Sequence, residues 1–306
     1  MMNEFSFLDV AFVPVELNHH QTLGEFLKRY PQPLSGYSMA SLNAWSASYH
    51  YEWGFVESDT VLISCAPDFG SRRHLMQPLG PVSIALQQKL MEGAAALSYP
   101  LRIVNVSGRF VRGHPALLNG FSLREDRPFS NYLYRTDALA RLRGRKYSKK
   151  RNLLSQASNL YSWGCKTLTA DWTDACFQVL DSIHEEEQPE ITGMMAREID
   201  ALKYTLTHYR ELKQQGLLIL VENAPVAFSI FEEISPTTVA VHFERALRRF
   251  KGLYQVINWE TAKVVAERGY EFINREEDLG DPGLRDAKSS YYPTRIIPSF
   301  ELKHKR

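Results

Sequence analysis

The sequence predicts an α/β protein made of two similar halves, each with a mixed sheet, and three observations support this. The chain has 306 residues, about twice the length of a typical domain. Hydrophobic residues make up 44% of it, which is enough to form complete cores. The order strand meander, turn, helix, strand occurs twice, although no residue-level repeat accompanies it. One large mixed sheet is the alternative that this pattern leaves open.

The first half begins the pattern with short apolar segments that are typical of strands. A turn containing Pro78 and Gly80 follows, and a segment with helical periodicity comes after it. The expected strands are residues 49–56, 60–65, 72–77 and 101–106, and the expected helix is residues 82–97. We assign these elements to an N-terminal domain, residues 1–158, which ends in a long connecting helix from Asp137 to about Leu160.

The second half repeats that order in residues 159–306, the expected C-terminal domain. We place Gly216 as the cap of one long helix and Gly269 as the residue that stops a later one. The expected helices are residues 171–184, 196–215 and 254–268, and the expected strands are residues 217–221, 226–232, 238–244 and 270–274.

The composition argues against several classes of protein. The net charge is only +1, so the whole chain is not a general binder of polyanions. The number of cysteines is odd, and none of the three has CxxC spacing, which argues against a disulfide framework or a zinc site. They are Cys65, Cys165 and Cys176. The start of the chain carries acidic residues and no basic flank, and no apolar run approaches the roughly 18 residues that span a bilayer. We therefore expect a cytoplasmic protein without a bound metal.

One window of the sequence is strongly basic. Seven of the eleven residues 141–151 are Lys or Arg and none is acidic, which leaves a charge of −6 for the rest of the chain. Such a charge density predicts a docking surface for nucleic-acid phosphates or for anionic lipid headgroups. A solvated helix face, partly paired with the acidic residues 185–187, is the alternative. The candidate anion-binding residues are Arg145, Lys146, Lys149, Lys150 and Arg151.

A basic turn lies directly between a predicted strand and a predicted helix. Gly252 would let backbone N–H groups point at a phosphate, and the helix N-terminus adds a favourable dipole. The pattern predicts a site for a ligand that carries a pyrophosphate, and a plain basic turn is the alternative. The candidate residues are Arg248, Arg249, Lys251, Gly252 and Tyr254.

The strand before this turn ends in His242 and Glu244. Strand alternation is expected to put these two side chains on one face and Phe243 on the other. Either could accept a proton from an attacking amine or hydroxyl, so both are candidate catalytic residues. A hydrogen-bonded pair without a catalytic role is the alternative, and two side chains do not complete a zinc shell.

A highly polar loop, residues 274–293, follows the last strand expected in the second half. Charges this closely spaced are costly to bury unless each is paired. Its acidic residues could bind a substrate ammonium, while Arg285 and Lys288, three apart on a short helix, would face one anion together. A solvated loop with internal salt bridges is the alternative. The candidate substrate-binding residues are Asn274, Glu276, Glu277, Asp278, Arg285, Lys288 and Tyr292.

The sequence also resembles a known family over nearly its whole length, most densely from about residue 130 onward. The matching motifs are Gly144-Arg-Lys-Tyr-Ser-Lys-Lys-Arg-Asn152, His242-Phe-Glu244, Tyr254-Gln-Val-Ile-Asn258, Asn274-Arg-Glu-Glu-Asp-Leu-Gly280, Gly283-Leu-Arg285 and Ala287-Lys288 with Tyr291. They resemble the DUF2156 family, which is related to the cytosolic C-terminal domain of phosphatidylglycerol lysyltransferase.

The resemblance implies two tandem GNAT-like domains, as in the Fem peptidoglycan aminoacyltransferases, with central strands that splay apart. It places the active site in the second domain and implies no cofactor site in the first, where the turn from Gln77 to Val82 lacks positive charge. The GNAT pyrophosphate turn has a pattern near [Q/R]xxGx[G/A]. Arg249 and Gly252 match it, whereas Tyr254 departs from it, and this departure puts ordinary acetyl-CoA use in doubt.

The expected function is therefore transfer of an aminoacyl group from aminoacyl-tRNA to an amine or hydroxyl acceptor, without a tightly bound cofactor. The tRNA backbone would dock on residues 141–151, and a lipid acceptor is compatible with the resemblance but not implied by it. An acyl-CoA-dependent N- or O-acyltransferase is one alternative. A non-catalytic module that binds an anionic lipid surface or nucleic acid is another. The amino acid, the acceptor and the oligomeric state do not follow from the sequence.

Overall fold

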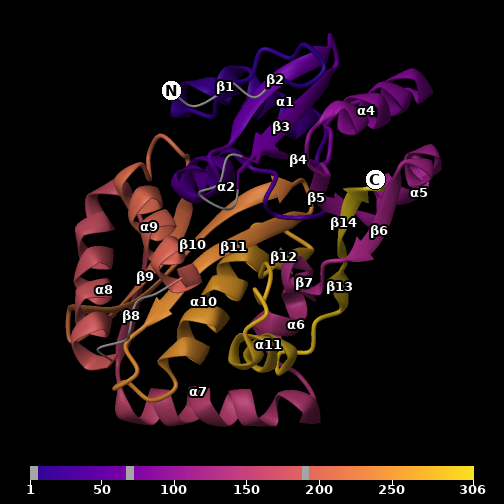
Figure 1. Ribbon diagram of the computed structural model, residues 1–306. Helices are drawn as coiled ribbons and strands as arrows, with labels where there is room; N and C mark the ends of the chain where they lie inside the picture. Colours follow the sequence, from indigo (N-terminus) through magenta and orange to yellow (C-terminus); the bar gives the residue numbers. More distant parts are fainter. Residues whose placement is uncertain (1–5, 67–71, 188–192) are drawn as a thin grey trace. The chain divides into compact units, whose positions relative to one another are not determined.

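The computed structural model describes residues 6–66, 72–187 and 193–306 (Figure 1). The chain forms two compact units. Unit 1 holds residues 1–131, 277–281 and 297–306, and unit 2 holds residues 132–276 and 282–296. The sequence predicted two consecutive domains that meet at residue 158. The units instead exchange segments, because the last strand of the chain joins the sheet of unit 1.

Unit 1 is built on a seven-stranded mixed sheet with the order β1-β2-β3-β4-β5-β14-β6. Strands β4 and β5 run parallel, and the other neighbouring pairs are antiparallel. The strands are β1 (Val13–Pro14), β2 (Glu52–Glu57), β3 (Thr60–Cys65), β4 (His74–Met76), β5 (Arg102–Ser107), β6 (Phe121–Glu125) and β14 (Ser299–His304). The helices are α1 (Leu23–Arg29), α2 (Met39–Ala44), α3 (Ser46–Tyr49), α4 (Ile84–Ala96) and α5 (Gly108–Gly113).

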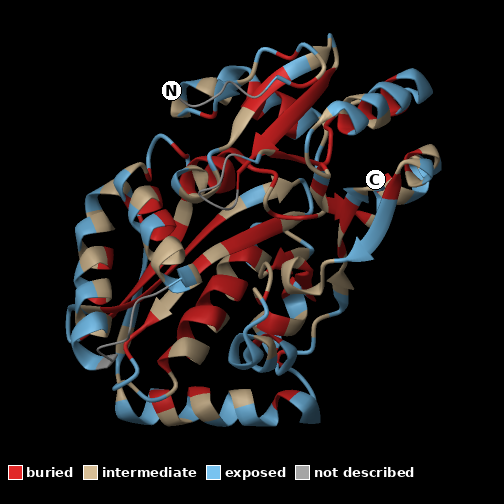
Figure 2. Cartoon of the chain, viewed as in Figure 1, coloured by how far each residue is buried: buried red, intermediate tan, exposed pale blue. Residues whose placement is uncertain are grey.

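Both faces of the unit 1 sheet are covered, and β3 shows how its sequence achieves this. Leu62 packs in one apolar cluster together with Leu86 and Leu90 of α4. Val61 and Ile63 pack in a second cluster, which includes residues of α1 and α2. Alternate side chains of a strand point to opposite faces, so a run of six buried residues predicts a strand covered on both sides. Figure 2 shows β3 buried along its length.

Unit 2 repeats this sheet topology with the order β8-β9-β10-β11-β12-β7-β13. The parallel pair is β11 with β12, and α10 connects them as α4 connects β4 and β5. The strands are β7 (Asn131–Arg135), β8 (Trp163–Thr167), β9 (Gln215–Val221), β10 (Ala224–Ser235), β11 (Thr238–Ala246), β12 (Phe272–Asn274) and β13 (Arg295–Ile297). The helices are α6 (Thr136–Arg141), α7 (Ser148–Leu160), α8 (Thr173–Glu187), α9 (Gly193–Thr207), α10 (Leu253–Glu267) and α11 (Pro282–Ser289).

The two sheets confirm the repeated element order read from the sequence, and neither is part of one large sheet. The strands and helices predicted in both halves are present with small shifts at their ends. The exception is the C-terminal part of the helix predicted over residues 196–215. That helix ends at Thr207, and Gly216 lies inside β9 rather than at a helix cap. A Cβ at Gly216 would lie 2.5 Å from the carbonyl oxygen of Ser229 in β10, so the glycine permits close strand approach.

The predicted connecting helix is also wrong as a single element. It is broken between α6 and α7, where Leu142 has a φ of 46° and Gly144 a φ of 90°. The guanidinium of Arg151 donates to the carbonyl oxygens of both residues and so holds the break. The dense positive charge that the sequence analysis placed on one helix is therefore spread over two helix ends and the turn between them.

Candidate functional site

The central strands of unit 2 separate early, as the resemblance implied. Strand β11 pairs with β12 only from Thr238 to Ala240, opposite Phe272 to Asn274. Strand β11 then continues to Ala246 along β10. The motifs singled out in the sequence at residues 242–244 and from residue 274 onward both lie at this divergence point.

Glu244 and Arg275 form an ion pair at the divergence point. Arg275 Nη2 lies 3.0 Å from Glu244 Oε1, and the two side chains are only 15% and 11% exposed. Asn258 of α10 donates to the other Glu244 oxygen at 3.4 Å. Burial alone would lower the pKa of Arg275, but the charge of Glu244 offsets this and the pKa is raised. Arg275 therefore keeps its charge at neutral pH.

Two further basic side chains come close to this ion pair around Tyr291. The Nζ of Lys150 lies 3.9 Å from the centre of the Tyr291 ring and 2.7 Å from Ser290 Oγ. The guanidinium of Arg275 lies 5.1 Å from the same ring, and Lys288 Nζ donates to the Arg275 carbonyl oxygen. Burial and the charge of Arg275 lower the pKa of Lys150. Lys150, from the basic window, is thereby connected to Arg275 through one aromatic ring.

His242 does not share a face with Glu244, and the alternation predicted from the sequence is wrong here. Phe231 pairs with Val241 while Ile230 pairs with Phe243, so His242 is the extra residue of a β-bulge. Glu244 lies opposite Ser229, which bonds to Thr261 of α10. His242 bonds to Glu232, three residues further along β10 and therefore on the other face. The two candidate catalytic side chains belong to separate groups.

His242 is held between two carboxylates on its own face. Its Nε2 lies 2.8 Å from Glu232 and its Nδ1 lies 2.7 Å from Glu276, with the imidazole side chain 6% exposed. Burial lowers the pKa of His242, but the two carboxylates outweigh it and raise the pKa to about 10. At neutral pH the imidazole is protonated, so it is poorly suited to accept a further proton. This geometry favours Glu244 over His242 as the proton acceptor.

The basic turn before α10 is packed against α7. Gly252 has a φ of 84°, and a Cβ there would lie 2.5 Å from the carbonyl oxygen of Leu153. The amide of Lys251 donates to the hydroxyl of Tyr161 at 3.3 Å, and Arg249 pairs with Glu186. These contacts give the glycine a packing role. Phosphate binding by Arg248, Arg249, Lys251, Gly252 and Tyr254 remains a prediction. Because α7 packs against Gly252, a phosphate could reach the amides there only if α7 moved.

The predicted substrate-binding residues are divided between the two units. Asn274 and Glu276 lie beside His242, where Glu276 N donates to Asn274 Oδ1 at 2.8 Å. Glu277 and Asp278 belong to unit 1. There Asp278 is fully buried and pairs with Arg127 at 3.1 Å. Its second oxygen accepts from Gly280 N, which is typical of a structural turn.

The remaining candidates of the polar loop lie on or after α11 in unit 2. Arg285 is half-buried and Lys288 is buried. Tyr292 is 47% exposed and lies 5.3 Å from Lys146 Nζ, so the buried aromatic residue of this loop is Tyr291 instead. The single motifs did not point to Arg275, Asn258 or Tyr291 as site residues. All three lie inside motifs that carry the family resemblance, and this was the available signal.

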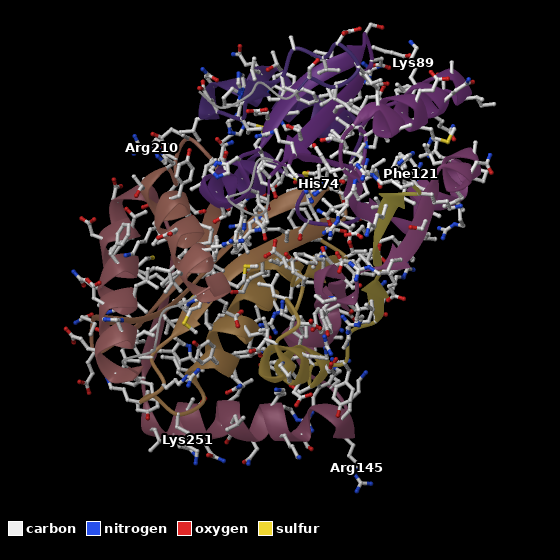
Figure 3. All side chains as sticks on the ribbon, in the orientation of Figure 1. His74, Lys89, Phe121, Arg145, Arg210 and Lys251 are labelled. Atoms are coloured by element: carbon white, nitrogen blue, oxygen red, sulfur yellow. The ribbon has the colours of Figure 1, made fainter. Side chains whose placement is uncertain are left out.

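The basic window forms an exposed surface, defined here as the α7 basic surface. Its exposed cations are Arg141, Arg143, Arg145, Lys146, Lys149 and Arg151. No cation of residues 141–151 has an acidic partner among the residues that the structure describes. Glu186, which lies in the acidic run considered as a partner, pairs with Arg249. Figure 3 labels Arg145 of this surface and Lys251, which lie near opposite ends of α7.

The described ranges, 6–66, 72–187 and 193–306, lack two kinds of feature. No group of three or more His, Cys, Asp and Glu side chains there is arranged to hold a metal ion. None of the helices in those ranges combines the length and apolar character that a membrane crossing requires.

Comparison with known proteins adds to this geometry. The family model for the C-terminal region of phosphatidylglycerol lysyltransferase matches residues 27–302. A conserved protein of unknown function from Bacteroides thetaiotaomicron VPI-5482 is 28% identical, with a TM-score of 0.88 over 97% of this chain and 100% of that chain. L-PGS from Bacillus licheniformis is 13% identical, with a TM-score of 0.64 over 94% of this chain and 92% of that chain.

A more distant structure confirms the fold. A tandem GNAT protein from the clavulanic acid biosynthesis pathway is 11% identical, with a TM-score of 0.51 over 97% of this chain and 99% of that chain. No curated protein matched the chain. The tandem GNAT-like fold implied by the resemblance is therefore confirmed, and the match over residues 27–302 means that the chain belongs to the family of the C-terminal domain of phosphatidylglycerol lysyltransferase.

Proposed function

We propose that this chain transfers an aminoacyl group from aminoacyl-tRNA to an amine or hydroxyl acceptor. The observation that carries the proposal is the connection between the α7 basic surface and the divergence point of β11 and β12. Lys150 belongs to the basic window and contacts Tyr291, which also contacts Arg275 of the buried ion pair. A polyanion bound to Lys150 on α7 would thus be separated from the Glu244–Arg275 ion pair only by the side chain of Tyr291.

The chemistry requires little from the protein because the ester of aminoacyl-tRNA is already activated. The acceptor atom forms a bond to the ester carbonyl carbon, the bond from that carbon to the ribose oxygen breaks, and a proton moves from acceptor to ribose oxygen. In this proposal Glu244, the carboxylate of the buried ion pair, accepts the proton, and Arg275 or Lys288 beside it stabilises the developing oxyanion. Positioning and charge stabilisation then supply most of the acceleration.

The contacts of the basic turn favour tRNA over acyl-CoA as the donor. A CoA pyrophosphate would need the amides near Gly252, where α7 packs and Tyr161 already accepts from the amide of Lys251. An aminoacyl-tRNA needs no such turn, because its phosphates can lie on the α7 basic surface. Lysine and phosphatidylglycerol are the first donor residue and acceptor to test, since the family description names a phosphatidylglycerol lysyltransferase.

The test is a transfer assay with labelled aminoacyl-tRNAs, lysyl-tRNA first. Acceptors are vesicles containing phosphatidylglycerol and, separately, soluble amines. We expect label in one acceptor, and we expect the variant Glu244→Gln to lower the rate by roughly 10²- to 10⁴-fold. Glu267→Gln is the matched control, since this carboxylate is exposed at the end of α10 and belongs to none of the candidate sites.

Two results would contradict the proposal. The first is transfer from acyl-CoA but from no aminoacyl-tRNA, which would favour a CoA-dependent acyltransferase. The second is binding of tRNA or vesicles without transfer to any acceptor, which would favour a non-catalytic binding module. Binding by the α7 basic surface also predicts affinity for tRNA that falls steeply with salt.

A further inference from the structure

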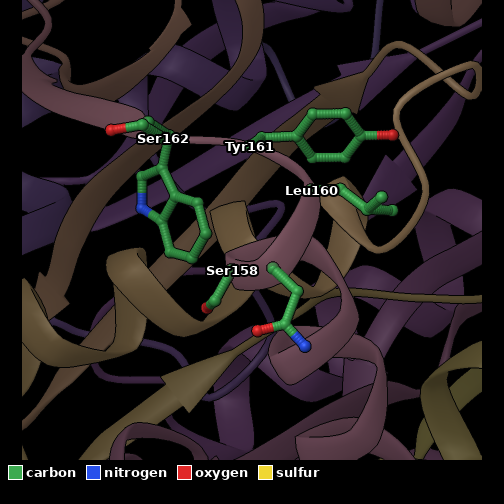
Figure 4. A pocket seen from close by; sticks show the side chains of 6 residues that line it. Ser158, Leu160, Tyr161 and Ser162 are labelled. Carbon is green, nitrogen blue, oxygen red and sulfur yellow. The ribbon is translucent and has the colours of Figure 1, made fainter.

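A hollow in unit 2 includes neither residue of the Glu244–Arg275 ion pair and none of the site residues predicted from the sequence. It is lined by six consecutive residues, 158–163, where α7 ends and β8 begins (Figure 4). Its volume is about 400 Å³, and it is widely open to solvent, a shallow depression rather than an enclosed cavity. An open hollow of this size suits one group of a larger ligand rather than a fully enclosed molecule.

The two aromatic rings of the hollow are fixed by hydrogen bonds behind them. Tyr161 accepts from the amide of Lys251 at 3.3 Å and contacts the edge of Phe250 with ring centroids 5.2 Å apart. Trp163 Nε1 donates to Glu260 at 3.2 Å, and Glu260 is in turn held by Lys263. Rings that are already ordered lose little entropy when a flat ligand stacks on them.

The rest of the lining combines an exposed apolar side chain with polar groups. Leu160 is 60% exposed, although it is a large aliphatic residue. Ser158, Asn159 and Ser162 supply hydroxyl and amide groups (Figure 4 labels both serines). The last carbonyl groups of a helix lack partners within that helix, so the end of α7 adds acceptors. This mixture does not suit an acyl chain, which would leave those polar groups without partners.

The charges around the hollow indicate which part of a ligand would enter it. The C-terminal end of α7 carries partial negative charge, which disfavours a phosphate and favours an amino group. One exposed cation, Lys251, lies beside Tyr161, and the α7 basic surface lies at the other end of a 13-residue helix. That helix is roughly 20 Å long. A single-stranded nucleic acid lying along α7 could therefore place its phosphates on the cations and one of its bases in the hollow.

We propose that this hollow binds an unstacked nucleobase of a single-stranded nucleotide segment by stacking on Tyr161 or Trp163. Its exocyclic amino groups would donate to the carbonyl oxygens at the end of α7. The identification of the nucleotide as part of tRNA rests on the proposed function. The same hollow could take the adenine of CoA, so the test has an arm for each source.

The test measures binding of a labelled single-stranded RNA heptamer that ends in adenosine, and of the same heptamer with an abasic last position. Replacing Tyr161 by Leu removes the aromatic face, and Tyr161→Phe keeps it. Stacking of one base contributes roughly 1–3 kcal/mol, so we expect Tyr161→Leu to weaken binding at least about fivefold and Tyr161→Phe to change it little. The abasic heptamer should bind the wild type about as weakly as the full heptamer binds Tyr161→Leu.

A second variant keeps the test valid if Tyr161→Leu perturbs folding. Leu160→Glu puts a negative charge at the mouth of the hollow on an exposed side chain, and its matched control is Ile84→Glu, at a 78% exposed position of α4 in unit 1. We expect only Leu160→Glu to weaken the binding of the heptamer. Equal affinity for both heptamers, together with unchanged affinity in Tyr161→Leu and Leu160→Glu, would overturn the proposal.

The second arm separates this proposal from the proposed function. AMP and CoA are titrated into the wild type and Tyr161→Leu by calorimetry. Binding of CoA that is lost in Tyr161→Leu, without any tRNA transfer activity, would support the nucleobase hollow and overturn the aminoacyltransferase. Normal transfer from aminoacyl-tRNA with unchanged nucleotide affinity in Tyr161→Leu would do the reverse.

Discussion

In both units the central parallel strands separate at the same place in the topology, but different side chains fill the space between those strands. In unit 1, β4 and β5 pair only over Leu75 and Met76, and the next residue, Gln77, is 3% exposed. Its Oε1 accepts from the amide of Ser107 at 2.8 Å and from its hydroxyl at 2.9 Å, and its Nε2 donates to Gln32 at 2.7 Å. One neutral amide therefore joins the two strands.

In unit 2 the corresponding place holds charged groups. Glu244 and Arg275 occupy one face, and His242 with Glu232 and Glu276 occupies the other. Removing charges from water costs several kcal/mol per ion, so buried pairs are weak evidence for stability. Unit 1 therefore joins its diverging strands through neutral groups, whereas unit 2 has buried charged groups there. Each prediction below tests that contrast.

The largest expected effect comes from breaking the ion pair. Glu244→Ala leaves Arg275 as a buried charge without its carboxylate and should destabilise the protein by about 3–5 kcal/mol. Gln77→Leu, the matched change in unit 1, leaves only neutral groups without partners and should cost about 1–3 kcal/mol. Urea unfolding of both variants measures the difference. A larger cost for Gln77→Leu would contradict the contrast between a neutral and a charged filling.

The second effect concerns how tightly α7 packs against the basic turn. Gly252→Ala combines a left-handed backbone with a Cβ 2.5 Å from the oxygen of Leu153. Gly269→Ala, at the end of the same helix, has a similar φ of 86° but no atom within 4 Å of its Cβ. Both pay the backbone cost of about 1–2 kcal/mol. We expect Gly252→Ala to cost about 1–3 kcal/mol more in thermal or urea unfolding. Equal costs would mean that the turn has room for a ligand.

The sequence alone predicted the two sheets well because their signals are local. The run 60–65 is buried on both faces, and the helices α4 and α10 bury residues three or four positions apart and follow glycine-containing turns. The exchange of β7 and β14 between the sheets could not be predicted. Both strands pair with partners far away in the sequence, and no local pattern specifies which sheet they join.

The candidate site was predicted in part, and a bulge accounts for the main error. The motifs ending in Glu244 and beginning at Asn274 do meet, but a single extra residue at His242 reverses the face of its side chain. Strand alternation assumes a regular pairing of the two strands. A bulge depends on cross-strand contacts, which cannot be read from the sequence. The sequence also could not show that Glu277 and Asp278, although next to Glu276, belong to unit 1.

The third effect is a pH dependence that only the charged unit should show. The pKa of His242 is raised in the folded protein from 6.5 to about 10, so protonation stabilises the folded state. This stabilisation is complete below pH 6.5 and is lost as the pH rises through about 10. Between these values stability should fall by up to about 1.4 kcal/mol per pH unit more than in His242→Gln. Unfolding measured for both proteins at several pH values gives the difference, and parallel curves would contradict it.

The smallest expected effect on stability is at the α7 basic surface. Arg145 and Lys149 are exposed, and they have no acidic partner in the described parts of the chain. Replacing both by Gln should change stability by less than about 0.5 kcal/mol. Each cation that contacts a phosphate contributes up to about 0.9 to the slope of log affinity against log salt. The double variant should therefore bind tRNA more weakly at low salt and with a shallower slope.

The matched control comes from unit 1 and makes the same change of net charge. Lys28 pairs with Glu25 at 2.8 Å and Arg29 pairs with Asp59 at 3.0 Å, so these cations already have acidic partners. The variant with both replaced by Gln should leave the salt slope of tRNA binding unchanged. If both double variants lowered the slope equally, tRNA would be responding to net charge alone. A lower slope in the α7 variant only would mean that the unpaired cations of unit 2 contact phosphate, because local pairing is what distinguishes the two sets.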